Sequence, residues 1–122
     1  MNPRSILAAF AFAAAACAPA FSQPVAVFAR IYVAPGREAE AQSRLEKLIA
    51  YVVEHEPDIV YRFYRDRSNP QSILTYEVYP SSEAAQRHLR EILPAAQASL
   101  GPAPEGLFTK PTEIQVGIPL GR

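Results

Sequence analysis

The spacing of apolar residues changes along the chain, and each change marks a predicted element. VAVFARIYV (Val25–Val33) is rich in β-branched and aromatic residues, which predicts a strand that ends at Pro35-Gly36. From about Arg37 to His55 the apolar positions recur every three or four residues, which predicts an amphipathic helix. Its apolar stripe consists of Ala41, Leu45, Leu48, Ile49 and Val52.

Two further strands are predicted as an antiparallel hairpin. IVYRFYRDR (Ile59–Arg67) and the segment Ser72–Tyr79 both have strand composition, and Ser68-Asn69-Pro70 between them favours a turn. Thr112–Ile118 predicts one more strand near the end of the chain.

A second helix is predicted between the hairpin and the last strand. Ser81 or Ser82 caps it, and Glu83 begins it. Pro94 is expected to break or kink this helix before a short helical piece that ends at Leu100. Its inward stripe consists of Ala85, Leu89, Ile92 and Ala96.

The resulting order β-α-β-β-α-β predicts an α+β, ferredoxin-like domain with a four-stranded antiparallel sheet. Right-handed crossovers would place both helices on one face of that sheet.

The other face of the predicted sheet is not polar, as an uncovered face should be. In the strand Ser72–Tyr79, one set of alternate residues contains Glu77 and its neighbours of the same parity, while the other contains Leu74, Tyr76 and Val78. Both faces therefore favour burial, and we expect a homodimer in which two open sheet faces stack. The alternative is a partly exposed aromatic face.

Residues 1–22 have the pattern of a secretory signal peptide. A basic start at Arg4 precedes an apolar run, and small residues allow cleavage after Ala20 or after Ser22. The alternatives are a transmembrane anchor, for which the run is short, and lipid attachment at Cys17. We expect an exported protein, most simply periplasmic, with residues 23–122 as one domain and no stable membrane anchor after cleavage.

Composition excludes several classes of function. The chain has 12 basic and 12 acidic residues and no basic patch with interleaved aromatics, so no nucleic-acid partner is expected. Its one cysteine lies in the predicted leader, and no His, Asp or Glu spacing resembles a metal site. We therefore expect no metal.

His88 is the main candidate for chemistry because it lies at the edge of the inward helix stripe, where imidazole could act as a base or a hydrogen-bond donor. The alternative is a packing role. Glu77 lies in an apolar strand, and a buried carboxylate needs a partner, which Arg62 or Arg30 could supply. Tyr61 and Tyr76 could line an aromatic pocket or simply fill the core.

Several short motifs occur together in order: Pro35-Gly36 before a helix, Glu56-Pro57 after it, YRFYRD, a turn ending in NP, then YEVY and SSEAAQRHL. Over Val25 to about Ile92 the chain resembles the antibiotic biosynthesis monooxygenase superfamily. The resemblance implies a dimeric α/β barrel and a cavity between each sheet and its own helices. It also implies that oxygenases without metal or flavin are among the relatives. Haem degradation is not expected, because Ala29 replaces the asparagine used there and the chain has no Trp.

The leading interpretation is a cofactor-free monooxygenase for a small aromatic or quinol-like molecule. His88 would be the base or proton shuttle, Tyr61 and Tyr76 would be wall and donors, Arg62 an anion partner, and Glu77 a group that orients a substrate hydroxyl. The alternatives are a non-catalytic small-molecule binding or scavenging protein and a purely structural dimer.

Overall fold

The computed structural model describes residues 23–121. The predicted leader therefore lies outside the described residues. The elements in chain order are β1 (Val25–Tyr32), α2 (Glu38–His55), β2 (Val60–Arg65), β3 (Ser72–Tyr79), α3 (Ser82–Arg87), a π-helical turn η1 (His88–Ile92), α4 (Leu93–Leu100) and β4 (Glu113–Gly117).

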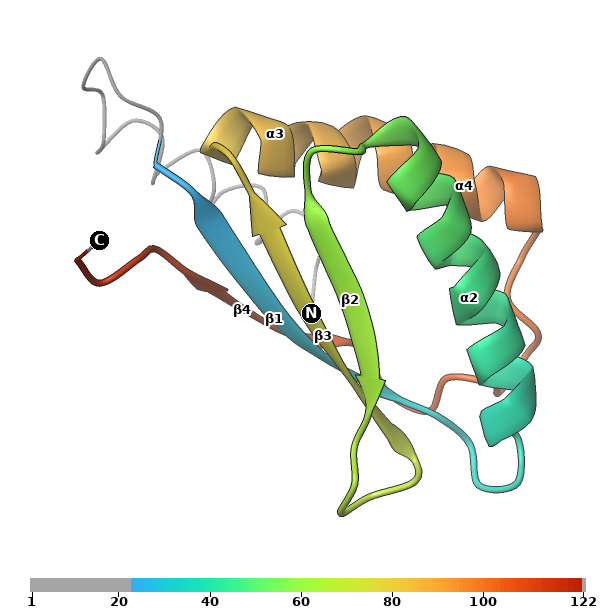
Figure 1. Cartoon of the computed structure of the whole chain (residues 1–122). Helices are drawn as coiled ribbons and strands as arrows, with labels where there is room; N and C mark the ends of the chain where they lie inside the picture. Colours follow the sequence, from blue (N-terminus) through green and yellow to red (C-terminus); the bar gives the residue numbers. More distant parts are fainter. Residues whose placement is uncertain (1–22, 122) are drawn as a thin grey trace.

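All neighbouring strands of the sheet are antiparallel, and their order is β2-β3-β1-β4. The helices cover one face, with α3, η1 and α4 crossing one end of the sheet while α2 lies beside β2 (Figure 1). The predicted ferredoxin-like order is confirmed. In the described part of this single chain, β2 and β4 form the edges of the sheet, which does not close into a barrel.

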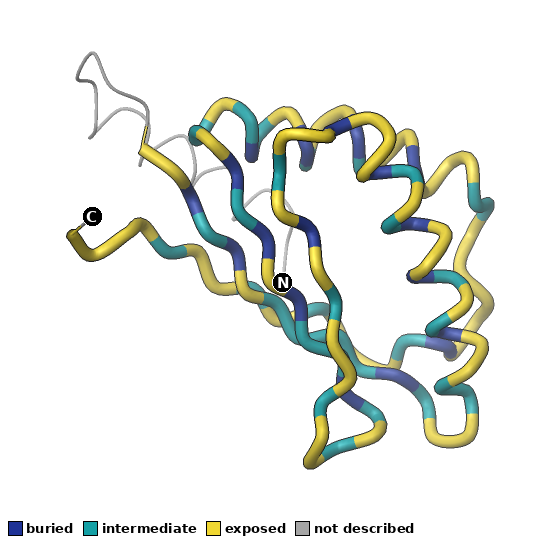
Figure 2. The backbone as a smooth tube through the Cα atoms, viewed as in Figure 1, coloured by how far each residue is buried: buried dark blue, intermediate teal, exposed yellow. Residues whose placement is uncertain are grey.

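The core lies between the sheet and the helices, where the buried positions of Figure 2 face one another. The predicted stripe of α2 is confirmed for Ala41, Leu45, Leu48 and Val52, which are buried, while Ile49 is half-buried. Leu107 is fully buried against Val33 and Ala41 although it belongs to no predicted element. A bridge between Val33 and Phe108 brings this segment to the end of β1.

The second helical region is irregular next to Pro94, where a break or kink was predicted. The elements α3, η1 and α4 follow one another without a gap, Pro94 is the second residue of α4, and the predicted helical piece ends at Leu100. The irregularity lies just before Pro94, where the N–H of Leu93 donates to the carbonyl of His88 in a widened π turn. Such turns are rare in proteins, and those that do occur often lie at functional sites.

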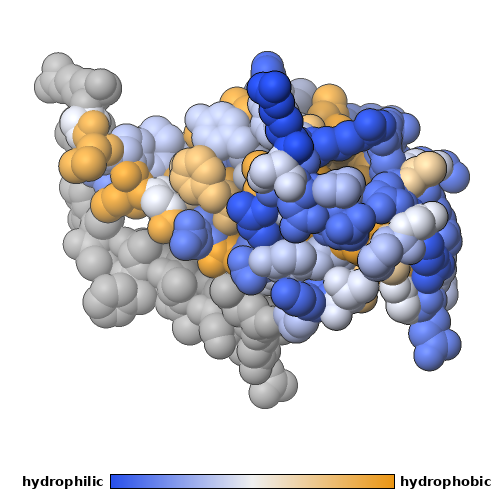
Figure 3. Space-filling view, turned by 90° about the horizontal axis from the view of Figure 1, so that it is seen from below, coloured by the Kyte–Doolittle hydropathy of each residue, from blue (hydrophilic) through white to orange (hydrophobic). Residues whose placement is uncertain are grey.

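The face of the sheet away from the helices carries large apolar side chains. Phe28, Tyr64 and Tyr76 keep 48%, 48% and 39% of their surface exposed. The rings of Phe28 and Tyr76 lie 5.6 Å apart on neighbouring strands. In Figure 3, apolar surface gathers on the side where the C-terminus lies, and hydrophilic residues dominate the side toward α2.

The N-terminus of α3 allows a direct test, because only one of the two candidate serines caps it. The hydroxyl of Ser81 accepts from the N–H of Ala84 at 3.1 Å. We expect Ser81→Ala to lower the free energy of unfolding by about 1 kcal/mol and Ser82→Ala to lower it by clearly less. Urea denaturation of both variants measures the difference, and equal losses would contradict the assignment of the cap.

Candidate functional site

His88 lies at the junction of α3 and η1 and points into the space between the helices and the sheet. It is 2% exposed, so its predicted inward orientation is confirmed. Its Nδ1 lies 2.6 Å from Oε2 of Glu56, which directly follows α2, and its Nε2 lies 4.0 Å from Oε1 of Glu77 on β3. The first distance is a short hydrogen bond, and the second is too long for one.

Glu77 accepts two hydrogen bonds from residues on its own strand. Thr75 Oγ1 donates at 2.9 Å, and the hydroxyl of Tyr79 donates at 2.5 Å. Burial raises the pKa of Glu77 because the charged carboxylate loses its hydration, and this outweighs the two donors and the nearby imidazole, which lower it. The expected arginine partner is absent from its contacts, since Arg30 instead binds Asp66 and Ser72.

Two tyrosine rings flank the imidazole. Tyr61 of β2 and Tyr79 of β3 each have their ring centroid 5.2 Å from that of His88. Burial, followed by the negative charge of Glu77, raises the pKa of both phenols. Both hydroxyls therefore remain protonated at neutral pH. In this state they can donate or accept hydrogen bonds, but they cannot act as phenolate anions.

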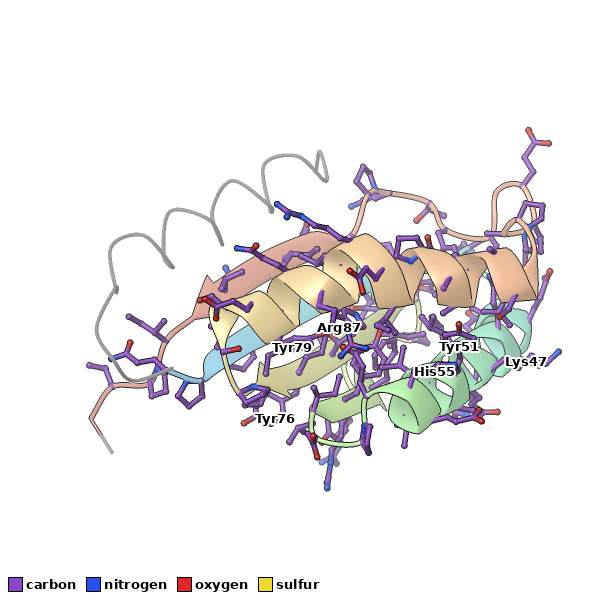
Figure 4. The ribbon with its side chains drawn as sticks, turned by 90° about the horizontal axis from the view of Figure 1, so that it is seen from above. Lys47, Tyr51, His55, Tyr76, Tyr79 and Arg87 are labelled. Carbon is purple, nitrogen blue, oxygen red and sulfur yellow. The ribbon has the colours of Figure 1, made fainter. Side chains whose placement is uncertain are left out.

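The predicted site residues divide between the two faces of the sheet. Tyr61 and Glu77 are directly opposite each other on β2 and β3, and both face His88. Arg62 and Tyr76 are likewise opposite each other, but on the open face. Figure 4 shows Tyr79 beneath the helical segment and Tyr76 outside it. Alternation along the strands causes this separation, because consecutive residues point to opposite sides.

Sequence reasoning did not name Glu56, Thr75 and Tyr79 as site residues. Glu56 follows Val52 by four positions, so it continues the buried stripe of α2 beyond the last helical residue. Thr75 and Tyr79 have the parity of Glu77. All three are polar or phenolic residues at positions that the periodicity of the helix or strand places on the buried face. This pattern could have identified them as site residues.

A cleft of about 230 Å³ opens between α2 and the strands β2 and β3. Its walls are mainly apolar, with Leu45, Ile49, Phe63 and Ile73 among the lining residues, while Glu38, Glu46 and Arg65 add charge. His88 is not part of the lining, but Phe63 is 5.0 Å from the ring of Tyr61, which in turn contacts His88. The cleft and the buried histidine are therefore connected through two successive aromatic rings.

The other histidine, His55, is exposed at the end of α2. Its Nδ1 lies 2.8 Å from the carbonyl oxygen of Tyr51, and the two rings stack with centroids 4.0 Å apart (Figure 4). Among residues 23–121, no cluster of three or more His, Cys, Asp or Glu side chains is arranged to hold a metal ion. Nor does this part of the chain contain a helix long and apolar enough to cross a membrane.

The raised pKa of Glu77 predicts a pH-dependent stability. The folded state keeps the proton to a higher pH than the unfolded state does, so the stability gained from the protonated form is complete below about pH 4.5 and is lost as pH rises through the folded pKa. We expect Glu77→Gln to be more stable than the wild type near neutral pH, by a margin that shrinks toward pH 4.5. Urea denaturation at a series of pH values measures this margin.

The matched control is Glu54→Gln, an exposed residue of α2 whose replacement should leave the pH profile unchanged. A Glu77→Gln variant that is less stable than the wild type at pH 7 to 8 would show that the ionised carboxylate contributes favourably.

Comparison with known structures identifies similar folds. A candidate antibiotic biosynthesis monooxygenase from Caulobacter crescentus is 25% identical, with a TM-score of 0.68, over 83% of this chain and 93% of that one. A conserved protein from Methanosarcina mazei is 22% identical, with a TM-score of 0.64, over 79% and 92%. A variant of SnoaB, a cofactor-independent oxygenase from Streptomyces nogalater, is 21% identical, with a TM-score of 0.59, over 79% and 92%.

No curated protein sequence matches the chain. The family model of the antibiotic biosynthesis monooxygenases matches residues 24–98, from β1 into α4, and so includes Glu56, Glu77 and His88. The chain therefore belongs to the antibiotic biosynthesis monooxygenase family.

Proposed function

We propose that this protein is a cofactor-independent monooxygenase that oxidises a small hydroxylated aromatic or quinol-like molecule with O₂. Family membership supports the class of reaction. The observation that carries the proposal is a buried imidazole, His88, which lies between the carboxylates of Glu56 and Glu77 and beside two tyrosine rings. A histidine has the proton affinity that a base needs near neutral pH.

The chemistry requires little from the protein beyond a base and a dry site. His88 removes the phenolic proton, and the resulting electron-rich anion donates electrons to O₂. For an anthrone-like substrate, a CH₂ group becomes C=O: one oxygen atom is bonded to that carbon, and the other leaves as water with the two hydrogens. The substrate supplies all four electrons that O₂ accepts. Donors near the developing oxyanion stabilise it most where water is excluded.

The cleft between α2 and the strands is the proposed substrate site. Its apolar walls suit an aromatic ring, and its volume of about 230 Å³ suits a small one. Phe63 and Tyr61 lie between this cleft and His88. Binding would therefore have to displace one of these rings for the substrate hydroxyl to reach the imidazole.

A second candidate function is non-catalytic binding or scavenging on the same fold. The burial of His88 favours it, because an imidazole that is 2% exposed and absent from the cleft lining is also what a structural histidine would be. Ligand binding without turnover would be the result expected for such a protein.

Oxygen consumption separates the two functions. With a panel of hydroquinones and anthrone-like phenols and chelator-treated protein, we expect uptake above autoxidation. His88→Gln should lower this uptake on the order of 10²-fold or more, since general-base catalysis contributes about that much. His55→Gln is the matched control, because it replaces an exposed histidine and should leave uptake unchanged. Saturable binding of the same compounds with no uptake would favour the binding protein.

We also propose that the open sheet face forms a homodimer interface. Phe28, Tyr64 and Tyr76 are exposed there, and large apolar groups on one face favour burial against a partner. Arg62 lies on the same face, so its proposed role moves from a substrate anion to this interface. Export to the periplasm remains a prediction from residues 1–22, which are outside the described part of the chain.

Light scattering during size-exclusion chromatography tests the interface. We expect the wild type to be a dimer and Tyr76→Glu to shift it toward monomer, because the change places a carboxylate in the apolar face. Gln97→Glu on the exposed surface of α4 is the control and should remain dimeric. A monomeric wild type at micromolar concentration would refute the proposed interface.

A further inference from the structure

We propose that Glu56 is a positioning residue for His88: its carboxylate keeps a proton on Nδ1 and leaves Nε2 as the nitrogen that exchanges protons with a bound substrate. This inference rests on the proposed function for its catalytic meaning. Its structural content, the fixed tautomer and orientation of the imidazole, can be tested without any substrate.

The geometry assigns the shared proton. Nδ1 of His88 and Oε2 of Glu56 are 2.6 Å apart, a distance that requires a hydrogen between them. An ionised carboxylate has no hydrogen to donate, so the nitrogen is the donor and the carboxylate oxygen the acceptor. The two side chains are only 3% and 6% exposed, so water cannot compete for either group.

Both partners are fixed by the ends of helices. The N–H of Glu56 donates to the carbonyl of Val52 at 2.7 Å, which holds Glu56 against the last turn of α2, and Pro57 restricts the chain just after it. The N–H of His88 is shared between the carbonyls of Ala84 and Ala85. The backbones of Glu56 and His88 are thus held in place, and only rotation of their side chains could separate the pair.

The surroundings of the imidazole remove that freedom as well. The rings of Tyr61 and Tyr79 flank it at 5.2 Å, and its Nε2 faces Glu77 at 4.0 Å without a hydrogen bond. Glu77 is already bonded to Thr75 and Tyr79. Of the two ring nitrogens, Nδ1 is therefore engaged and Nε2 is not, which is the arrangement that a proton-exchanging histidine requires.

The π turn helps to orient the side chain of His88 toward Glu56. In η1 the carbonyl of His88 accepts from the N–H of Leu93, five residues later. A regular helix would use the N–H of Ile92, four residues after His88, at this point. The widened turn lets α3 and α4 keep Ala85 and Ala96 buried while His88 points to Glu56.

Nitrogen-15 NMR of histidine-labelled protein is the deciding experiment. In the wild type we expect the Nδ1 of His88 to be protonated throughout the range pH 6 to 9, because its hydrogen bond to the carboxylate of Glu56 keeps the proton on this nitrogen. The spectrum contains only two histidines, and His55→Gln identifies the signal of His88. An unprotonated Nδ1 in the folded wild type at any pH in this range would overturn the proposal.

Variants of the carboxylate then separate positioning from packing. Glu56→Ala should release the proton to Nε2 in the neutral ring, whereas Glu56→Gln retains an acceptor oxygen and should keep the Nδ1–H form. Glu54→Ala, an exposed neighbour on α2, is the matched control. An unchanged tautomer in a folded Glu56→Ala variant would contradict the proposal. If that variant fails to fold, the wild-type and Glu56→Gln spectra still decide it.

Activity adds an independent readout. If the wild type consumes oxygen, Glu56→Ala should lower kcat on the order of tenfold or more with little change in KM, and Glu56→Gln should be less affected. Equal kcat in wild type and Glu56→Ala would refute a positioning role in the reaction. If the wild type shows no turnover, the proposed function fails, and the NMR result still decides whether Glu56 fixes the imidazole.

Discussion

The short hydrogen bond between Glu56 and His88 is the interaction on which the interior of this protein depends. It joins the end of α2 to the junction of α3 and η1, two segments far apart in the sequence. Burying a carboxylate without a hydrogen-bond partner destabilises the folded state. Each of the two side chains lowers this cost for the other by supplying its partner. The same burial excludes water, which strengthens the bond and restricts the imidazole to one orientation.

Glu77 extends this polar centre into the sheet and makes the strand pairing specific. Its position opposite Tyr61 and Val27 requires the observed register, and its bonds to Thr75 and Tyr79 place a polar cluster on this one face of β3. A slip of β3 by one residue would place the carboxylate on the open face and bring Tyr76 or Val78 beneath the helices. An apolar interior alone would discriminate less strongly between the two registers, because both faces of β3 carry large apolar side chains.

The fold was readable from the sequence because its elements have clear periods. The bounds of β3 were predicted to the residue, and the inward orientation of His88 followed from the stripe of the second helix. The site was only half readable, since Arg62 and Tyr76 lie one residue from Tyr61 and Glu77 and yet on the other face. Contacts between distant segments, such as Glu56 with His88, depend on how α2 ends against the sheet, which no local pattern describes. The π turn was missed because Pro94 can be accommodated in several ways.

The π turn has a consequence for how this chain can tolerate changes in length. It holds one residue more than a regular turn would, so deleting a single residue within His88–Ile92 could restore an uninterrupted helix at little local cost. Because the widened turn absorbs its extra residue, the parts of the helix before and after the deletion would keep their orientation, and the change would be confined to the side chains of this turn. Relatives with a one-residue gap at this point would keep the architecture and the apolar packing, but would no longer direct a side chain at position 88 toward the acidic centre.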